Sequence, residues 1–423
     1  MIPSGERTDL TSYLLGERSE LRALIEAISQ AEVDDERERA AVEYLLVLAS
    51  ARLAASGEAV ESRALAQVRG QYRRVFAKDS SEHGSLLREL YSALSKTREV
   101  DVITALKLLG LYHRKLGAYQ SARAAFSVAT ELASKQSDPI DHLNTLFWLG
   151  VAERYIGNLD RAEAVHREQL ALAREVHSSA QAVLAQENLG LVALRRGQVA
   201  EARKRVLRAL NEALELEDPE IEGYCYHARM TVETYAGRPG EAAACGWKAY
   251  VRYESTEQRL RALQDCAVVL YGCGFYEEAQ AGWEIVRDDT EEHAVIARCR
   301  MGLMEAAAKL GDREGFESLV EEFHADSRLS GLPFEFMETH HSLGLAFGEF
   351  REEAQARHHL MKSLALAEEG AYEAQALEIR DQLQRLVSAG SIEVEPASVP
   401  GDEYERLEDV GSSIKAERSR LCA

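Results

Sequence analysis

Apolar residues recur at positions three or four apart over most of the chain, which is the period of an amphipathic α-helix. A longer period of roughly 40 residues lies on top of it. Glycines mark this period at Gly117, Gly157, Gly197, Gly237, Gly274 and Gly311, and the last two steps are slightly shorter than the others. Arg351 stands one further step along, where the same pattern closes without a glycine. A regular spacing of this length predicts a repeat protein.

Two further columns of residues accompany these glycines. Seven residues upstream, a Leu-Gly pair recurs, with its glycine at Gly110, Gly150, Gly190 and Gly344. Downstream, a column of alanines precedes a bulky column that includes Phe126, Trp283 and Leu360 and that His166 interrupts. Small residues let two helices approach closely, and a glycine between them permits the left-handed conformation that ends the first helix. Each unit is therefore predicted to be a helix pair that stacks on its neighbours.

Prolines agree with these boundaries. Pro139, Pro219 and Pro333 lie just before the first helix of a unit, and Pro239 lies in the turn within a unit. None falls inside a predicted helix, where it would cost about 3 kcal/mol.

The clearest unit, Ala105 to Ala133, carries a Leu-Gly pair, a Gly-x-aromatic step, and then Ala122, Phe126 and Ala129 at fixed spacings. This pattern resembles the tetratricopeptide repeat (TPR), and seven units of decreasing similarity cover residues 102–387. Steps of 37–40 residues exceed the usual 34, so we expect helices longer by about one turn. Long-helix TPR units occur in kinesin light chains and in the Rap family of peptide-sensing bacterial regulators. The resemblance implies an all-α, right-handed superhelical α-solenoid of about seven helix pairs.

The two ends of the chain lack the glycine columns. Residues 1–98 show helical periodicity, with helices expected at Glu20–Ile28, Glu36–Ala55, Ser62–Phe76 and Leu86–Leu94, and form either a small N-terminal bundle or degenerate capping repeats. The solenoid then spans 99–387. Residues 388–423 are rich in small and acidic residues, so we expect a disordered acidic tail in which Ile414–Leu421 could form a short helix.

Composition narrows the classes of function. A formal net charge of −21 argues against nucleic acid and anionic membranes as partners. The N-terminal sequence has no signal pattern, no apolar run is long enough to span a membrane, and six scattered cysteines indicate reduced thiols, so we expect a cytoplasmic protein. The sequence leaves the oligomeric state open.

Helical geometry indicates where a partner would bind. One arc of each first helix faces away from its packing positions, and in TPR proteins this arc lines the concave groove. In the first three repeats the arc carries five basic residues and one acidic residue, the reverse of the chain as a whole. Asn188 joins them because it matches an asparagine that some long TPR proteins direct at a ligand backbone. The candidate partner-binding residues are Lys107, Arg114, Lys115, Asn144, Phe147, Arg154, Tyr155, Glu187, Asn188, Arg195, Tyr224, His227, Tyr235, Arg261 and Tyr271.

These residues predict a non-enzymatic scaffold or adaptor that binds a peptide or helix, with an acidic segment as the favoured form, in a basic groove bearing tyrosines. Leu111 stands where the dicarboxylate clamp of chaperone-binding TPR proteins has an asparagine, so capture of a chaperone C-terminus is not expected. The alternative is a peptide-gated regulator with the layout of the Rap family, which sequesters or releases a target protein. In either case the acidic tail could fold back into the groove.

Catalysis and cofactors find no support in the sequence. It contains no HExxH, phosphate loop, GxSxG or CxxC motif. His340 and His341 face His358 and His359 across a helix pair, but adjacent residues on a helix diverge by about 100°, so at most one from each pair can point at a shared atom. We expect no metal there, and we expect Cys266 and Cys273 to be small core residues.

Overall fold

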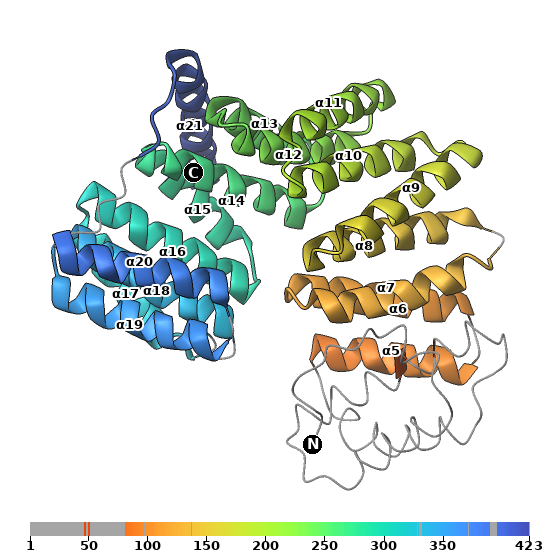
Figure 1. Ribbon diagram of the computed structural model, residues 1–423, viewed down its shortest axis with the longest axis horizontal. Helices are drawn as coiled ribbons and strands as arrows, with labels where there is room; N and C mark the ends of the chain where they lie inside the picture. Colours follow the sequence, from red (N-terminus) through yellow and green to blue (C-terminus); the bar gives the residue numbers. More distant parts are fainter. Residues whose placement is uncertain are drawn as a thin grey trace, which may run out of the picture. The chain divides into compact units, whose positions relative to one another are not determined.

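The computed structural model describes residues 46, 47, 50, 81–96, 99–136, 138–327, 329, 332–370, 372–389 and 396–422. These residues form α-helices joined by short turns (Figure 1), which confirms the predicted all-α architecture of helix pairs. The helices are α5 (Glu82–Lys96), α6 (Glu99–Lys115), α7 (Tyr119–Ala133), α8 (Pro139–Ile156), α9 (Leu159–Glu175), α10 (Ser179–Arg195), α11 (Val199–Leu216), α12 (Pro219–Tyr235), α13 (Pro239–Arg252), α14 (Thr256–Gly272), α15 (Tyr276–Asp289), α16 (His293–Leu310), α17 (Arg313–Ala325), α18 (Pro333–Glu349), α19 (Glu353–Glu369), α20 (Glu373–Ala389) and α21 (Gly401–Leu421).

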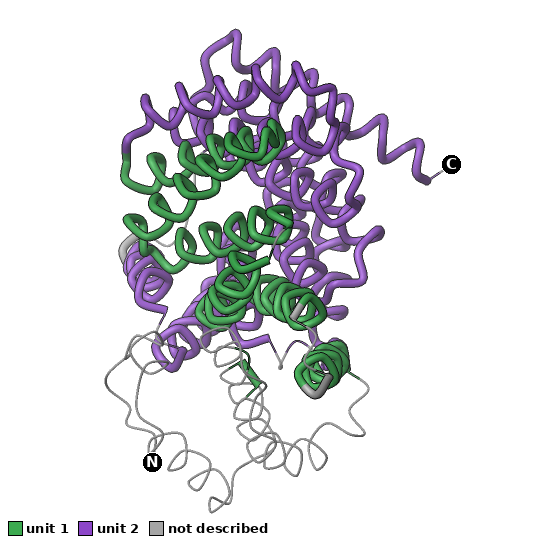
Figure 2. Tube along the Cα trace, turned by 90° about the vertical axis from the view of Figure 1, so that its right-hand side faces the viewer, with its two compact units in different colours: residues 1–197 green, residues 198–423 purple. Residues whose placement is uncertain are grey.

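The chain divides into two compact units, residues 1–197 and residues 198–423, shown in different colours in Figure 2. The boundary between them lies in the turn at Gly197, inside the third predicted repeat, a division that the glycine columns did not indicate. In the first unit the first helices of the repeats are α6, α8 and α10; in the second they are α12, α14, α16 and α18.

The turns within the repeats have the conformation that the glycine spacing predicts. All six glycines of the predicted series have positive φ, from 70° at Gly117 to 93° at Gly157. Arg351 adopts the same left-handed region with φ of 59°, at the place where the series lacks its glycine. The backbone geometry of the turn therefore continues through the seventh repeat even where its usual residue is missing.

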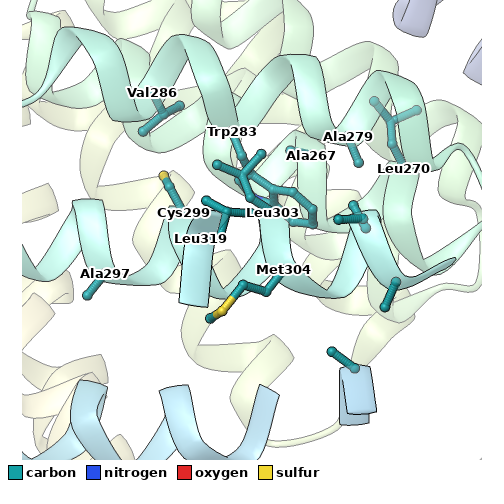
Figure 3. Close-up of a cluster of buried hydrophobic side chains, with 14 of the residues drawn as sticks. Ala267, Leu270, Ala279, Trp283, Val286, Ala297, Cys299, Leu303, Met304 and Leu319 are labelled. Carbon is teal, nitrogen blue, oxygen red and sulfur yellow. The ribbon is translucent and has the colours of Figure 1, made fainter. Parts of the chain in front are cut away.

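The upstream glycines make room for bulky side chains from the second helix of each pair. A Cβ atom on Gly110 would lie 2.6 Å from the Phe126 ring, and one on Gly150 would lie 2.4 Å from Nε2 of His166. Trp283 on α15, in the cluster drawn in Figure 3, lies in the same way against Gly302 of the next first helix, where a Cβ atom would lie 2.6 Å from the indole ring. At these places the core is closely packed because a glycine leaves room for a large side chain of the facing helix.

Prolines and acidic caps define where several helices begin. Pro139, Pro219 and Pro333 occupy the first turns of α8, α12 and α18, and Pro239 does so in α13. In this position a proline loses no hydrogen bond, since that N–H has no partner within the helix. The side chains of Asp138 and Asp218 accept hydrogen bonds from the first backbone N–H groups of α8 and α12, which satisfies donors that a helix start leaves open.

The C-terminal segment differs from the expectation. Residues 401–421 form the long helix α21, so the prediction of a disordered tail is wrong there. Leu407, Val410 and Ile414 are buried against the core of the second unit, and α21 packs on α13 and α15. The apolar residues of this helix are few and widely spaced among acidic ones, which is why composition suggested disorder.

One helix of the predicted N-terminal bundle lies among the described residues. Helix α5 contains the expected Leu86–Leu94 helix, and its Leu87 and Leu90 are fully buried. The helices expected at Glu20–Ile28, Glu36–Ala55 and Ser62–Phe76 fall in a region of which the structure describes only residues 46, 47 and 50.

Candidate functional site

The fifteen candidate residues lie on five first helices. In the first unit α6 carries Lys107, Arg114 and Lys115, α8 carries Asn144, Phe147, Arg154 and Tyr155, and α10 carries Glu187, Asn188 and Arg195. In the second unit α12 carries Tyr224, His227 and Tyr235, and α14 carries Arg261 and Tyr271. The candidates therefore form two sets, one in each unit.

Cations and aromatic rings pair on the first helices of the first unit. The guanidinium of Arg114 lies 5.0 Å from the Trp148 ring centre, and that of Arg154 lies 4.8 Å from the Tyr155 ring centre. Tyr155 in turn stacks on Tyr119, with 4.5 Å between the ring centres and an angle of 1° between the planes. Tyr155 is 38% exposed, so this stack offers a flat aromatic surface beside a positive charge.

An acid that interacts with Arg154 is buried. Glu187 is 4% exposed, and burial raises the pKa of its carboxyl to about 8, although the charge of Arg154 and a hydrogen bond from Asn188 lower it. That hydrogen bond runs from Asn188 Nδ2 to Glu187 Oε2 over 2.5 Å. The carboxyl is therefore mostly protonated at neutral pH and does not neutralise Arg154.

Arg154 also has an N–H group without a hydrogen-bond acceptor among the described residues. Its Nε atom is buried and has no hydrogen-bond partner among the residues that the structure describes. A buried N–H without a partner costs free energy. Since the Nε atom itself is buried, a ligand oxygen would bind the rest of the guanidinium, which belongs to a half-buried side chain. Arg154 is thus the candidate residue best suited to bind an anion.

A chain of amide side chains links α8 to its neighbours. His166 Nδ1 contacts Gln169 Oε1 at 3.0 Å, Gln169 donates to Gln181 at 2.9 Å, and Gln181 donates to Asn144 Oδ1 at 3.0 Å. Because the Asn144 oxygen is occupied by Gln181, its amide NH₂ is the group left to face a ligand carbonyl.

Three candidates of the first unit are interior residues. Phe147 is 7% exposed, Asn188 is 2% exposed, and Glu187 is the buried acid described above. Phe147 packs edge-on against Trp148 at 4.7 Å. The predicted arc describes an isolated helix, whereas α8 also contacts the first helices of the neighbouring repeats, α6 and α10. These three side chains therefore support the site from behind and are not exposed anchors.

The remaining basic candidates differ in how they are held. Lys107 donates to Asp141 on α8 at 2.8 Å, so its charge is already matched. Lys115 and Arg195 are exposed at the ends of α6 and α10. An exposed cation contributes mainly long-range attraction.

In the second unit two candidates, His227 and Tyr271, contact acids of the next repeat. His227 on α12 contacts Asp265 on α14 at 2.9 Å. Although burial raises the pKa of Asp265, the His227 hydrogen bond and the charges of Arg261 and Arg298 hold it below its usual range. Tyr224 packs edge-on against Tyr253, and only Tyr235, at 64%, is strongly exposed among the candidates here.

Sequence reasoning named Tyr271 on α14 but missed the buried polar cluster that surrounds it on α16, α18 and α20. Ser342 donates to Glu305 at 2.6 Å, and His341 Nε2 contacts Gln382 at 2.5 Å. Burial raises the pKa of the Glu305 carboxyl. Burial also raises the pKa of Tyr271, and the nearby Glu305, its hydrogen-bond partner, raises it further. The partners in each hydrogen bond lie one repeat apart in the chain, so the repeat spacing was the signal that could have paired them.

The histidine pairs meet as helical geometry requires. His340 Nδ1 lies 2.9 Å from His359 Nδ1, one residue from each pair. Burial and the neighbouring Lys362 lower the pKa of His340 to about 3, and burial with His358 lowers that of His359 to about 4. Within the described ranges, no group of three or more His, Cys, Asp or Glu side chains is arranged to hold a metal ion.

Helix length and hydropathy bear on membrane insertion. Over the part of the chain that the structure describes, no helix is both long and apolar enough to cross a bilayer.

No family model matches the sequence, and no curated protein matches it. Solved structures with a similar fold include a Rap protein complexed with Competence and Sporulation Factor, at 12% identity over 87% of this chain and 99% of that one, with a TM-score of 0.47. The Rap conjugation gene regulator of plasmid pLS20 in complex with the Phr* peptide matches at 14% identity over 84% and 98%, with a TM-score of 0.48. TPR-like repeats of a putative kinesin light chain from Podosopora anserina match at 16% identity over 46% and 99%, with a TM-score of 0.38. At these values the likeness concerns the arrangement of helices alone, and the chain is similar to TPR-like repeat proteins in that respect.

Proposed function

We propose that the chain is a non-enzymatic protein-interaction scaffold that holds a peptide or helix of a partner on the exposed side of α6, α8 and α10. The observation that carries the proposal is Arg154. The acid Glu187, which interacts with it, is held neutral by burial, its Nε atom lacks a partner among the described residues, and its guanidinium lies over the exposed Tyr155 ring.

The chemistry of this surface favours an acidic segment with an apolar or aromatic side chain nearby. Arg154 would accept a carboxylate, the Tyr155–Tyr119 stack would cover an apolar side chain, and Asn144 would donate to a backbone carbonyl. Arg195 and Lys115, both exposed, would add attraction at a distance. In the second unit His227 and Arg261 are already engaged with Asp265, so we assign the primary contact to the first unit.

The test is a selection of peptides from a random display library on the full chain. We expect the enriched peptides to carry Asp or Glu beside an apolar residue. Arg154→Glu with Arg195→Glu should weaken their binding about tenfold or more, because each reversal removes an attraction and adds a repulsion. Arg161→Glu, an exposed arginine on the second helix α9, is the matched control and should leave binding unchanged.

Circular dichroism of all variants should show the helicity of the wild type, because Arg161 and Arg195 are exposed and Arg154 is only half-buried. Selected peptides that lack acidic residues, or that bind the Arg154→Glu, Arg195→Glu chain as well as the wild type, would remove the proposal.

A further inference from the structure

Helix α21 breaks the alternation of helix pairs in the second unit. It is not the partner of α20 but lies across α13 and α15, the second helices of the fourth and fifth repeats (Figure 1). These are not the first helices to which the sequence assigned a binding groove. The tail therefore covers a surface separate from the candidate site.

The surface beneath α21 is shaped for a closely packed helix. A Cβ atom on Gly240, in the first turn of α13, would lie 2.2 Å from the backbone oxygen of Glu403. A Cβ atom on Gly411 of α21 would lie 2.5 Å from Glu278 on α15. A glycine on each side thus permits the helices to touch at two separate points along α21.

Charges on the two sides are complementary. Lys415 Nζ lies 2.8 Å from Glu277 and 2.9 Å from Glu278. Arg418 lies 3.2 Å from Glu284 and 2.8 Å from Asp288. Arg406 pairs with Glu241 near the start of α13. We call the acidic and glycine positions on α13 and α15 the α21 seat; its residues are Gly240, Glu241, Glu277, Glu278, Glu284 and Asp288.

Helix α21 also supplies a carboxylate to the end of α13. Glu403 Oε2 accepts a hydrogen bond of 2.8 Å from the backbone N–H of Glu241, one of the N–H groups that a helix start leaves without an internal partner. This contact fixes the position of α21 along the seat, while Leu407, Val410 and Ile414 turn its apolar side inward.

The contact resembles the docking of a ligand more than the packing of a repeat. Only three large aliphatic side chains of this 21-residue helix are buried. Most of its other contacts are polar: ion pairs at a half-exposed rim, the Glu403 hydrogen bond and one from Tyr250 to Glu417, beside the packing of Tyr404 on Phe275. Exposed ion pairs are screened by salt and exchange readily with water. Removal of α21 would expose an acidic surface with only a small apolar centre, which water can solvate.

We propose that the α21 seat is a docking surface for a basic amphipathic helix of a partner protein, and that α21 occupies it in cis. A competing helix needs apolar residues spaced as Leu407, Val410 and Ile414 are, a small residue after the second of them, and basic residues at the positions of Lys415 and Arg418. This surface is independent of the first-helix site, so either proposal can fail alone.

A synthetic peptide of residues 398–422 is the probe, and fluorescence anisotropy on the full chain is the measurement. The chain's own helix competes at a high effective concentration, so the wild type should bind the peptide weakly. The Lys415→Glu, Arg418→Glu chain repels its own helix from the seat and should bind the unaltered peptide about a hundredfold more tightly. A peptide with the same two reversals is the matched control and should bind neither chain.

Equal binding of the unaltered peptide to the wild-type and doubly reversed chains, both with wild-type helicity, would overturn the proposal. If the reversed-charge peptide bound the doubly reversed chain as tightly as the unaltered peptide does, the proposal would also be overturned, because the α21 seat would then not recognise basic residues. If the double variant loses helicity, a second full-length chain with a protease site between residues 389 and 396 keeps the test open. After cleavage, excess peptide should displace α21 as seen by native mass spectrometry, and retention of the cleaved helix would contradict the proposal.

Discussion

Replacing Glu187 with glutamine removes the ionisable group beside Arg154 while keeping an oxygen that can accept the hydrogen bond from Asn188. The ordinary pKa of this carboxyl is 4.5, and burial raises it to about 8 in the folded chain. At pH 7 the unfolded chain has released the proton that the folded chain keeps. At about 1.4 kcal/mol for each pH unit, holding the proton from 4.5 up to pH 7 costs about 3 kcal/mol.

The sign of the pH dependence follows from this proton. Wild-type stability should fall as the pH rises from 4.5 to about 8, since the folded state binds one proton more than the unfolded state over that interval. The free energy of unfolding of Glu187→Gln should therefore exceed that of the wild type by up to about 3 kcal/mol at pH 7. This difference should shrink to less than about 1 kcal/mol at pH 5.

Urea unfolding followed by circular dichroism at pH 5, 6, 7 and 8 measures both chains. Glu175→Gln, an exposed carboxyl at the end of α9, is the control and should leave the pH dependence unchanged. A stability difference between wild type and Glu187→Gln that is the same at every pH would refute the assignment of a neutral, buried Glu187.

Two other predictions concern the packing of α8 and α14. Burial lowers the pKa of His166 from 6.5 to about 4, so the chain should lose stability as the pH falls from 6.5 to 4. His166→Phe, which restores the residue type of the equivalent Phe126, should remove that loss, which is about 2–3 kcal/mol at pH 4.5. Urea titrations measure it, and an unchanged acid dependence in the variant would contradict the prediction. Gly150→Ala should destabilise the folded chain by about 1–3 kcal/mol, because its Cβ would lie 2.4 Å from His166. Gly272→Ala, whose Cβ would have nothing within 4 Å, should stabilise the folded chain by about 0.4–1 kcal/mol. Shifts of the melting temperature with the same sign in both variants would contradict the packing described.

The repeat architecture could be predicted from the sequence because each of its determinants is local. A left-handed turn needs glycine, a close helix contact needs a small residue, and a first turn tolerates proline, so these residues mark the repeat wherever they occur. Arg351 marks the limit of this reasoning, since the turn keeps its geometry there without glycine.

The site was predicted only in part because burial depends on neighbours that one helix does not reveal. The periodicity of α8 placed Phe147 and Arg154 on the same arc, but contact with adjacent first helices buries Phe147 and leaves Arg154 over Tyr155. The altered pKa of Glu187 arises from that same burial. The folding of α21 onto α13 and α15 depends on glycine contacts between distant parts of the chain, such as that of Gly411 with Glu278, and local composition carries no trace of them.

A charge-swap experiment tests the central claim most directly. An acidic peptide selected on the wild-type chain is made again with lysine at its acidic positions, and both peptides are titrated against the wild type and against Arg154→Glu, Arg195→Glu by calorimetry. We expect each chain to prefer the peptide of opposite charge, so that the lysine peptide regains on the variant much of the affinity that the acidic peptide loses. If the variant binds neither peptide, or if both chains bind both peptides alike, Arg154 and Arg195 do not recognise the partner's charge and the site lies elsewhere.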